Sequence, residues 1–171
     1  MPIDDCKYTF DAMATTVLPA YMDKMRTAIE NAQPSSLFCQ SGLGLKGLLS
    51  KLGRKEDFSG CYVLLHDRQP FYVGISRSVI QRLRQHLTGK THYDASLAYM
   101  MAKGEAEHSM RRAEAMADDN FRRAFDEAQQ LLRNCKVAFV EIGNPLELYF
   151  LFEAYCAMEL NTCKWNTFRT H

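Results

Sequence analysis

The sequence has 171 residues, of which 47% are hydrophobic and 24% are charged, and this composition fits one globular domain with a sizeable core. No apolar run approaches the about 20 residues that a membrane span needs, and the polar, acidic start is not a signal peptide. These features exclude a membrane protein, so we expect a soluble, cytoplasmic one, and the net charge of +1 excludes a uniformly basic chain.

The first third of the chain is predicted to be helical. Apolar residues recur at helical spacing over residues 9–31, and the run Gln33–Ser36 breaks that helix. A short amphipathic helix is expected at about residues 44–52, followed by a polar loop. We interpret residues 1–58 as a helical N-terminal extension.

From residue 60 the pattern changes to short apolar runs that are typical of strands. Residues 61–66 and 71–75 are two such runs, and the turn-forming Asp67–Pro70 lies between them. This arrangement predicts an antiparallel hairpin. Ser78 then begins a helix that continues to about Leu87.

The second half of the chain is predicted to hold a helical insertion, a strand and a buried helix. Residues 95–134 have helix-forming composition throughout, with Gly104 between two helices. A third strand is expected at residues 135–142, and Pro145 suits the start of a helix that ends at about Leu160. The element order predicts an α+β fold, in which a small three-stranded antiparallel sheet is flanked by helices over residues 59–171.

The predicted hairpin and the helix after it carry polar residues in a distinctive order. Gly60-Cys61-Tyr62 lies on the first strand and Tyr72-Val73-Gly74 on the second, so the tyrosines are ten residues apart. Arg82 follows ten residues later, and His86 lies one helical turn beyond it. This pattern resembles the paired signature of the GIY-YIG nucleases, and the resemblance extends to Glu153 in the last long helix and to Asn166.

Elementary geometry is consistent with a shared site for these residues. Tyrosines on facing strands of a hairpin can point to one spot, and Arg82 and His86, at i and i+4, share a helix face. Cys61 and Val73 are apolar and should point away from the tyrosine face. Glu153 lies in a strongly apolar run, where a carboxylate needs a partner, either a metal ion or Arg82 in a buried ion pair.

The resemblance implies a metal-dependent DNA endonuclease that leaves 5′-phosphate ends. Tyr62 or Tyr72 would deprotonate the attacking water, helped by Arg82 and by a protonated His86, or a neutral His86 would itself take the proton. Glu153 would hold one Mg²⁺ (or Mn²⁺), and Asn166 would orient a neighbouring group.

The charge distribution is uneven along the chain. Residues 42–90 contain nine basic and three acidic side chains, a local net charge of +6. This excess is typical of a phosphate-binding face, although a solvated surface would look the same. Arg77, Arg84 and Lys90 are candidates for contacts with the DNA backbone.

Alternative functions use the same sequence differently. The chain could be a non-catalytic nucleic-acid-binding module that retains the fold, or an interaction protein that works through its helical insertion. Cleavage of both DNA strands generally needs two active sites, so a homodimer is a further expectation. The six cysteines include no C-x-x-C spacing, which is unfavourable for a structural zinc site.

Overall fold

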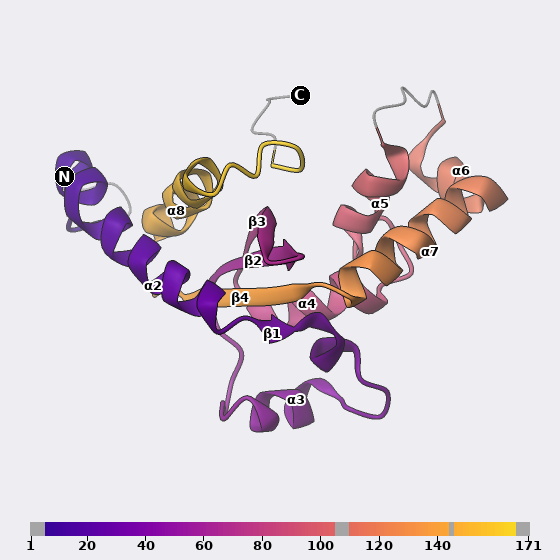
Figure 1. Cartoon of the computed structure of the whole chain (residues 1–171), viewed down its shortest axis with the longest axis horizontal. Helices are drawn as coiled ribbons and strands as arrows, with labels where there is room; N and C mark the ends of the chain where they lie inside the picture. Colours follow the sequence, from indigo (N-terminus) through magenta and orange to yellow (C-terminus); the bar gives the residue numbers. More distant parts are fainter. Residues whose placement is uncertain (1–5, 105–109, 144–145, 167–171) are drawn as a thin grey trace. The chain divides into compact units, whose positions relative to one another are not determined.

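The computed structural model describes residues 6–104, 110–143 and 146–166, whose helices and strands are drawn in Figure 1. The chain forms two compact units. The sheet unit comprises residues 1–33, 56–79 and 136–171, and the helical unit comprises residues 34–55 and 80–135. Among the helices in the described residues, none has the length and apolar character needed to cross a bilayer.

The sheet has the strand order β1-β4-β2-β3. The central strand β2 (Gly60–His66) pairs antiparallel with both β3 (Gln69–Ser76) and β4 (Lys136–Glu141). Asp67 and Arg68 form the two-residue turn of the β2–β3 hairpin at positive φ angles of 48° and 67°, which match the right-handed twist of the strands. The predicted hairpin and the strand after the insertion are therefore confirmed.

The number of strands differs from the prediction, because the sheet has four strands rather than three. The additional strand, β1 (Gln33–Pro34), lies at the edge beside β4, in the run that the sequence analysis interpreted only as the end of a helix. Two residues are too few to show the alternation of a strand, and an edge position tolerates a proline that has no N–H to donate.

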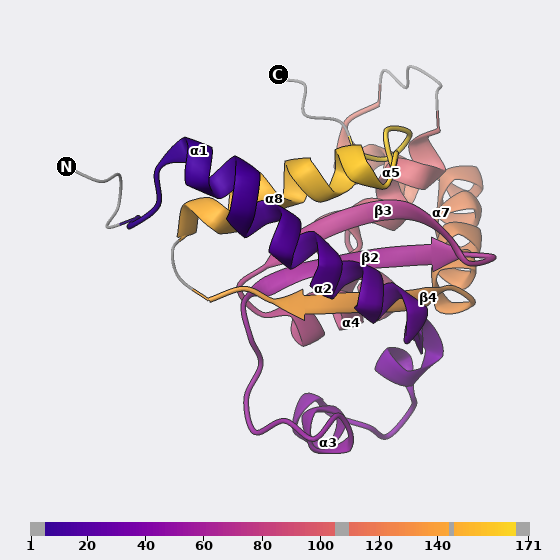
Figure 2. The same ribbon diagram turned by 60° about the vertical axis from the view of Figure 1, so that its left-hand side comes forward.

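Two helical segments pack on one face of the sheet (Figure 2). The N-terminal segment consists of α1 (Phe10–Ala12), a π-helical turn η2 (Met13–Val17) and α2 (Leu18–Glu30), which confirms the predicted helix of residues 9–31. The second segment is α8 (Leu146–Glu159); the predicted start at Pro145 lies outside the described residues. The apolar core between these helices and the sheet includes Cys61, Val63, Leu65, Val73, Met22, Met25, Phe152 and Cys156.

The helical unit contains a 3₁₀ segment and several α-helices. Gly104, at a φ of 60°, follows the end of α5 as predicted, and Asp118 divides the rest of the insertion by accepting a hydrogen bond from the Phe121 N–H at 2.8 Å. This second division was not predicted from the sequence. The elements are η3 (Ser35–Cys39), α3 (Leu45–Lys51), α4 (Val79–Thr88), α5 (Ser96–Lys103), α6 (Arg112–Ala117) and α7 (Asp119–Arg133).

Side chains of α7 hold the C-terminal end of α4. Gln129 Nε2 donates to the carbonyl oxygens of Gly89 at 2.8 Å and His86 at 3.2 Å, and Arg133 Nε donates to that of Leu87 at 2.9 Å. The last carbonyl groups of a helix have no partner within the helix. These bonds therefore satisfy the end of α4 and fix the helix that carries Arg82 and His86.

Candidate functional site

The two motif tyrosines lie together on the sheet. Tyr62 pairs with Gly74 across the hairpin and Leu64 pairs with Tyr72, so both phenol rings lie on the same face. Their ring centroids are 6.2 Å apart, and Tyr62 is 1% exposed. The structure thus places the two phenols next to each other, as the sequence predicts.

The two motif glycines make this arrangement possible. A Cβ atom on Gly74 would lie 2.5 Å from both Cζ and Oη of Tyr62, so the ring of Tyr62 lies directly across the glycine. A Cβ atom on Gly60 would overlap the carbonyl oxygen of Val140 on the neighbouring strand. Each glycine is therefore required by a close approach, one of a side chain and one of the backbone.

The middle residues of the two motifs face the other way. Cys61 and Val73 are completely buried in the apolar core under α2 and α8, as their apolar character predicts. The alternation of a strand thus separates the polar face of the motif from its structural face.

Asn166 binds the outer edge of β3. The Val73 N–H donates to Asn166 Oδ1 at 2.8 Å, and Asn166 Nδ2 donates to the Val73 carbonyl oxygen at 2.7 Å. One side-chain amide thereby satisfies both backbone groups of an edge-strand residue, as a neighbouring strand would. The contact places Asn166 beside the strand that carries Tyr72, where it can position the hairpin.

Glu153 lies on α8 within a polar cluster at the edge of the core. Burial raises the pKa of its carboxyl group. Burial also raises the pKa of the Tyr149 phenol to about 12, with a further increase from Glu153 and an opposing effect of the Arg77 charge. The pKa of Cys61 is raised by burial, by its hydrogen bond to the Cys156 thiol and by the charges of Cys156 and Glu153.

The neighbours of Glu153 were not predicted from the sequence. The apolar position of Cys61 was predicted correctly, but neither Tyr149 nor the two thiols were connected with the carboxylate. A signal was present, because Tyr149 and Glu153 are four residues apart on a helix and Cys156 follows at three. The contribution of Cys61 comes from a different element, and no local pattern reveals it.

Arg82 and His86 belong to the helical unit. Arg82 Nη2 donates to Ser96 Oγ at 2.7 Å, and Nη1 donates to the carbonyl oxygens of Asp94 at 3.0 Å and Tyr93 at 3.4 Å. His86 is buried, and burial followed by the Arg82 charge lowers its pKa to about 3. The imidazole is therefore neutral at neutral pH.

The three predicted DNA contacts have different environments. Arg77 is exposed, and its charge acts on Tyr149. Arg84 Nη1 donates to the carbonyl oxygens of Leu43 at 2.7 Å and Phe38 at 3.4 Å, so its guanidinium holds the chain between η3 and α3. Lys90 is exposed just after α4.

The described residues contain no group of three or more His, Cys, Asp or Glu side chains arranged to hold a metal ion. Glu153 is instead a single, partly buried carboxylate whose pKa is raised by burial. Mg²⁺ keeps several water ligands and is commonly held by one or two carboxylates together with substrate phosphates. The chemistry of Glu153 fits such a site, and a cation beside it would offset the cost of burying its charge.

Comparison with known proteins adds one finding to this geometry. No curated protein and no solved structure matches the chain. A family model does match, and the matched segment includes Tyr62, Tyr72, Arg82 and His86, whereas Glu153 and Asn166 follow it in the chain. Residues 58–117 of this chain match the model of the GIY-YIG catalytic domain, the family that the paired motifs resemble.

Proposed function

We propose that this protein is a metal-dependent DNA endonuclease that hydrolyses phosphodiester bonds. The observation that carries the proposal is the pair of phenols on one face of the sheet, with the Tyr62 ring lying across a glycine, inside the segment that matches a catalytic domain. Two adjacent phenols, one of which lies across a glycine, form an arrangement that packing alone does not require. We further propose residues 59–171 as the catalytic domain, with its insertion at about 95–134.

A phenol is our choice for the group that activates water. A free phenol has a pKa of about 10, and lowering it by two units takes about 2.7 kcal/mol of selective stabilisation of the phenolate. Arg82 and a metal ion are the charges that would supply this stabilisation. Tyr62 and Tyr72 remain the two alternatives for this role.

His86 is assigned a hydrogen-bonding role rather than that of the base. A group whose pKa is about 3 carries no charge at neutral pH and is a weak proton acceptor there. The low pKa of His86 thus supports the alternative in which the imidazole is neutral, and disfavours the one in which it acts as a cation.

Arg82 is proposed to bind the scissile phosphate. Its guanidinium donates to two backbone carbonyl oxygens, the Ser96 hydroxyl and the side-chain oxygen of Gln85. A phosphate carries negative charge and can accept two parallel hydrogen bonds from one guanidinium, so it can replace these neutral partners. Exposed Arg77 and Lys90 are proposed as further contacts with the DNA backbone. Arg84 would contact the DNA only if its hydrogen bonds to the carbonyl oxygens of Leu43 and Phe38 were replaced by bonds to a phosphate.

Glu153 is proposed to hold one Mg²⁺ (or Mn²⁺), which would stabilise the leaving 3′ oxygen when it is bound. Asn166 would keep β3 and its tyrosine in position through the bonds to Val73. Cleavage would leave 5′-phosphate ends, and a homodimer would allow both strands to be cut.

The test is incubation of the chain with plasmid DNA, branched DNA and RNA, with and without Mg²⁺. We expect metal-dependent cleavage, and we expect Glu153→Gln to lower the rate by about 10²- to 10³-fold, by analogy with the loss of other groups that stabilise developing charge. Glu127→Gln, at an exposed site on α7, is the matched control and should cleave at the wild-type rate. Binding of DNA without cleavage by the wild-type chain would support the non-catalytic module instead.

A further inference from the structure

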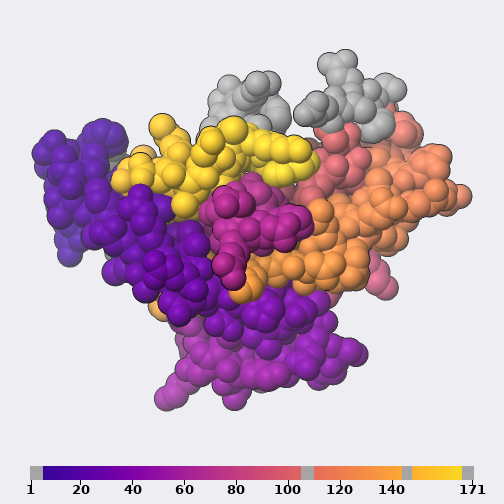
Figure 3. Space-filling view, in the orientation of Figure 1, coloured from indigo at the N-terminus to yellow at the C-terminus, as the bar shows by residue number. Residues whose placement is uncertain are grey.

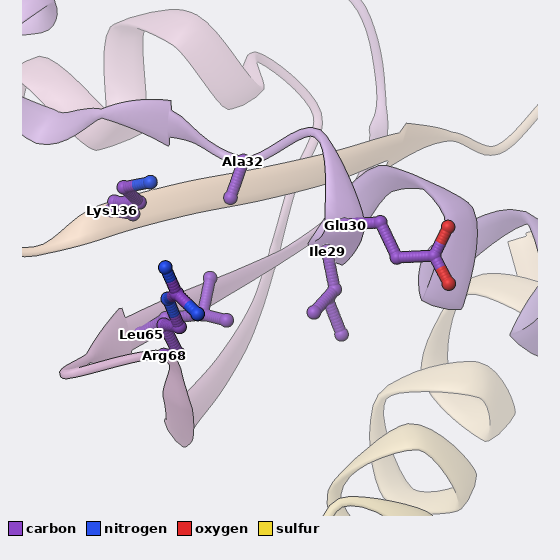
Figure 4. Close-up of a pocket in the computed structure, with 6 residues that line it drawn as sticks. All are labelled: Ile29, Glu30, Ala32, Leu65, Arg68 and Lys136. Carbon is purple, nitrogen blue, oxygen red and sulfur yellow. The ribbon is translucent and has the colours of Figure 1, made fainter.

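A hollow of about 380 Å³ lies at the hairpin end of the sheet unit. It is formed by the end of α2 and the chain after it, by the β2–β3 hairpin and by the first residue of β4. Figure 4 shows the residues that line it, and Figure 3 shows the hairpin (magenta) at the molecular surface beside α2 (indigo). The lining residues are Ile29, Glu30, Ala32, Leu65, Arg68 and Lys136.

Two cations share one side of this hollow. Lys136 pairs with Leu65 across the sheet, and Arg68 lies in the turn that follows β2, so both side chains project near the same end of β2. Among the described residues, neither side chain takes part in a hydrogen bond or an ion pair. Their charges are therefore available to an anion.

The acidic side chains nearby do not neutralise these cations. Asp67 Oδ2 lies 3.6 Å from His66 Nδ1, on the same turn. Glu30 lines the hollow, but Figure 4 shows its carboxylate directed away from Arg68 and Lys136. The side of the hollow that carries the two cations is thus positively charged, and Ile29, Ala32 and Leu65 form the apolar part of the lining.

The backbone of the turn indicates that Arg68 is there for its side chain. Arg68 has a φ of 67°, a conformation that glycine adopts freely and that costs other residues roughly 1–2 kcal/mol. Two-residue hairpin turns of this kind favour Asn-Gly or Asp-Gly, and this chain has Asp-Arg. A strained residue where glycine would be more stable points to a function for the side chain.

We infer that this hollow binds a phosphate of the DNA backbone, away from the tyrosine pair. The planar guanidinium of Arg68 suits two phosphate oxygens, Lys136 adds a point charge, and the apolar lining residues suit the adjoining sugar. Leu65 is three residues beyond Tyr62 on β2, so the alternation of the strand places the hollow on the opposite face of the sheet from the tyrosine pair, with the core residues Cys61 and Val63. The inference rests on the proposed function for its substrate, but it concerns binding and not cleavage.

The test measures DNA binding as a function of salt concentration, in EDTA so that cleavage does not interfere. A labelled duplex is titrated with the wild-type chain, Arg68→Gly, Lys136→Gln and the double variant, using fluorescence anisotropy. Because both side chains contact one phosphate, the double variant should reduce the slope of log K against log salt by about 1, and each single variant should reduce it by part of that amount. Lys164→Gln, which removes an exposed lysine of the same unit outside the hollow, should change the slope by much less.

Two features of the design separate a binding effect from damage to the fold. Arg68→Gly relieves the strained φ, so its thermal midpoint should equal or exceed that of the wild-type chain while its binding weakens. Glu30→Gln should leave binding unchanged or strengthen it, because it removes a negative charge from the lining. Unchanged slopes in both cationic variants would overturn the inference, as would a slope change in Lys164→Gln equal to theirs.

The outcome of this binding test does not depend on whether the chain cleaves DNA. If the wild-type chain binds DNA without cleaving it, while the variants lose slope as expected, the phosphate site stands and the nuclease proposal fails. A competition arm with inorganic phosphate and a mononucleotide identifies the source of the phosphate. The mononucleotide could saturate the hollow while the variants leave duplex binding unchanged. That result would overturn the assignment of the hollow to a phosphate of the DNA backbone.

Discussion

Gly74 is the residue on which the geometry of the tyrosine pair depends. Its missing side chain leaves room for the buried Tyr62 ring, and an added Cβ would lie 2.5 Å from Cζ and Oη. We expect Gly74→Ala to lower the free energy of unfolding by about 1–3 kcal/mol, the usual cost of overpacking, and to displace Tyr62. Thermal unfolding measures this loss. Gly143→Ala, where a Cβ would meet nothing within 4 Å, is the control, and equal losses in both variants would contradict the explanation.

At the scale of elements, the edge of β3 is held by the segment that follows α8. Asn166 makes two hydrogen bonds to Val73, each of the kind that contributes about 0.5–1.5 kcal/mol. Asn166→Ala should therefore loosen β3 locally and speed hydrogen exchange of the Val73 amide, while amides of the central strand β2 keep their protection. Unchanged exchange at Val73 in this variant would show that Asn166 does not position the strand, and any loss of activity would then need another cause.

At the scale of the whole molecule, buried His86 makes stability depend on pH. Its pKa is lowered from 6.5 to about 3 in the folded chain, so below pH 6.5 the unfolded chain binds a proton that the folded chain does not. Above pH 6.5 the titration of His86 should not lower the free energy of unfolding. Below pH 6.5 the free energy of unfolding should fall by up to about 1.4 kcal/mol per pH unit as the pH approaches 3. The raised pKa of Glu153 acts in the opposite sense, because the folded chain then holds that proton more tightly.

Urea unfolding between pH 7 and pH 4 checks this dependence. His86→Gln removes the titrating imidazole, so its stability should vary less with pH than that of the wild-type chain. His92→Gln, a matched change at a partly exposed histidine of the same unit, should keep the wild-type dependence. The explanation fails if both variants follow the wild-type curve.

The sequence by itself determined the order of most elements and the identity of the motif. The hairpin could be predicted because Asp67–Pro70 and the apolar runs beside it are local signals. The long N-terminal helix could be predicted because its apolar spacing extends over many residues. Tyr62, Tyr72, Arg82 and His86 could be singled out because their order and spacing resemble a family signature, and all four lie within the matched residues 58–117.

Only the tertiary structure decided which residues meet. The bonds between Asn166 and Val73 join positions 93 residues apart, and those of Arg84 to Leu43 and Phe38 join positions 41 and 46 apart. No local pattern predicts such pairs. Packing of distant segments also produces three further features: the two-residue strand β1, the Tyr62 ring across Gly74 and the cationic hollow at the hairpin end. Periodicity and turn chemistry act between near neighbours in the chain, whereas partners, burial and pKa shifts arise when distant segments pack together.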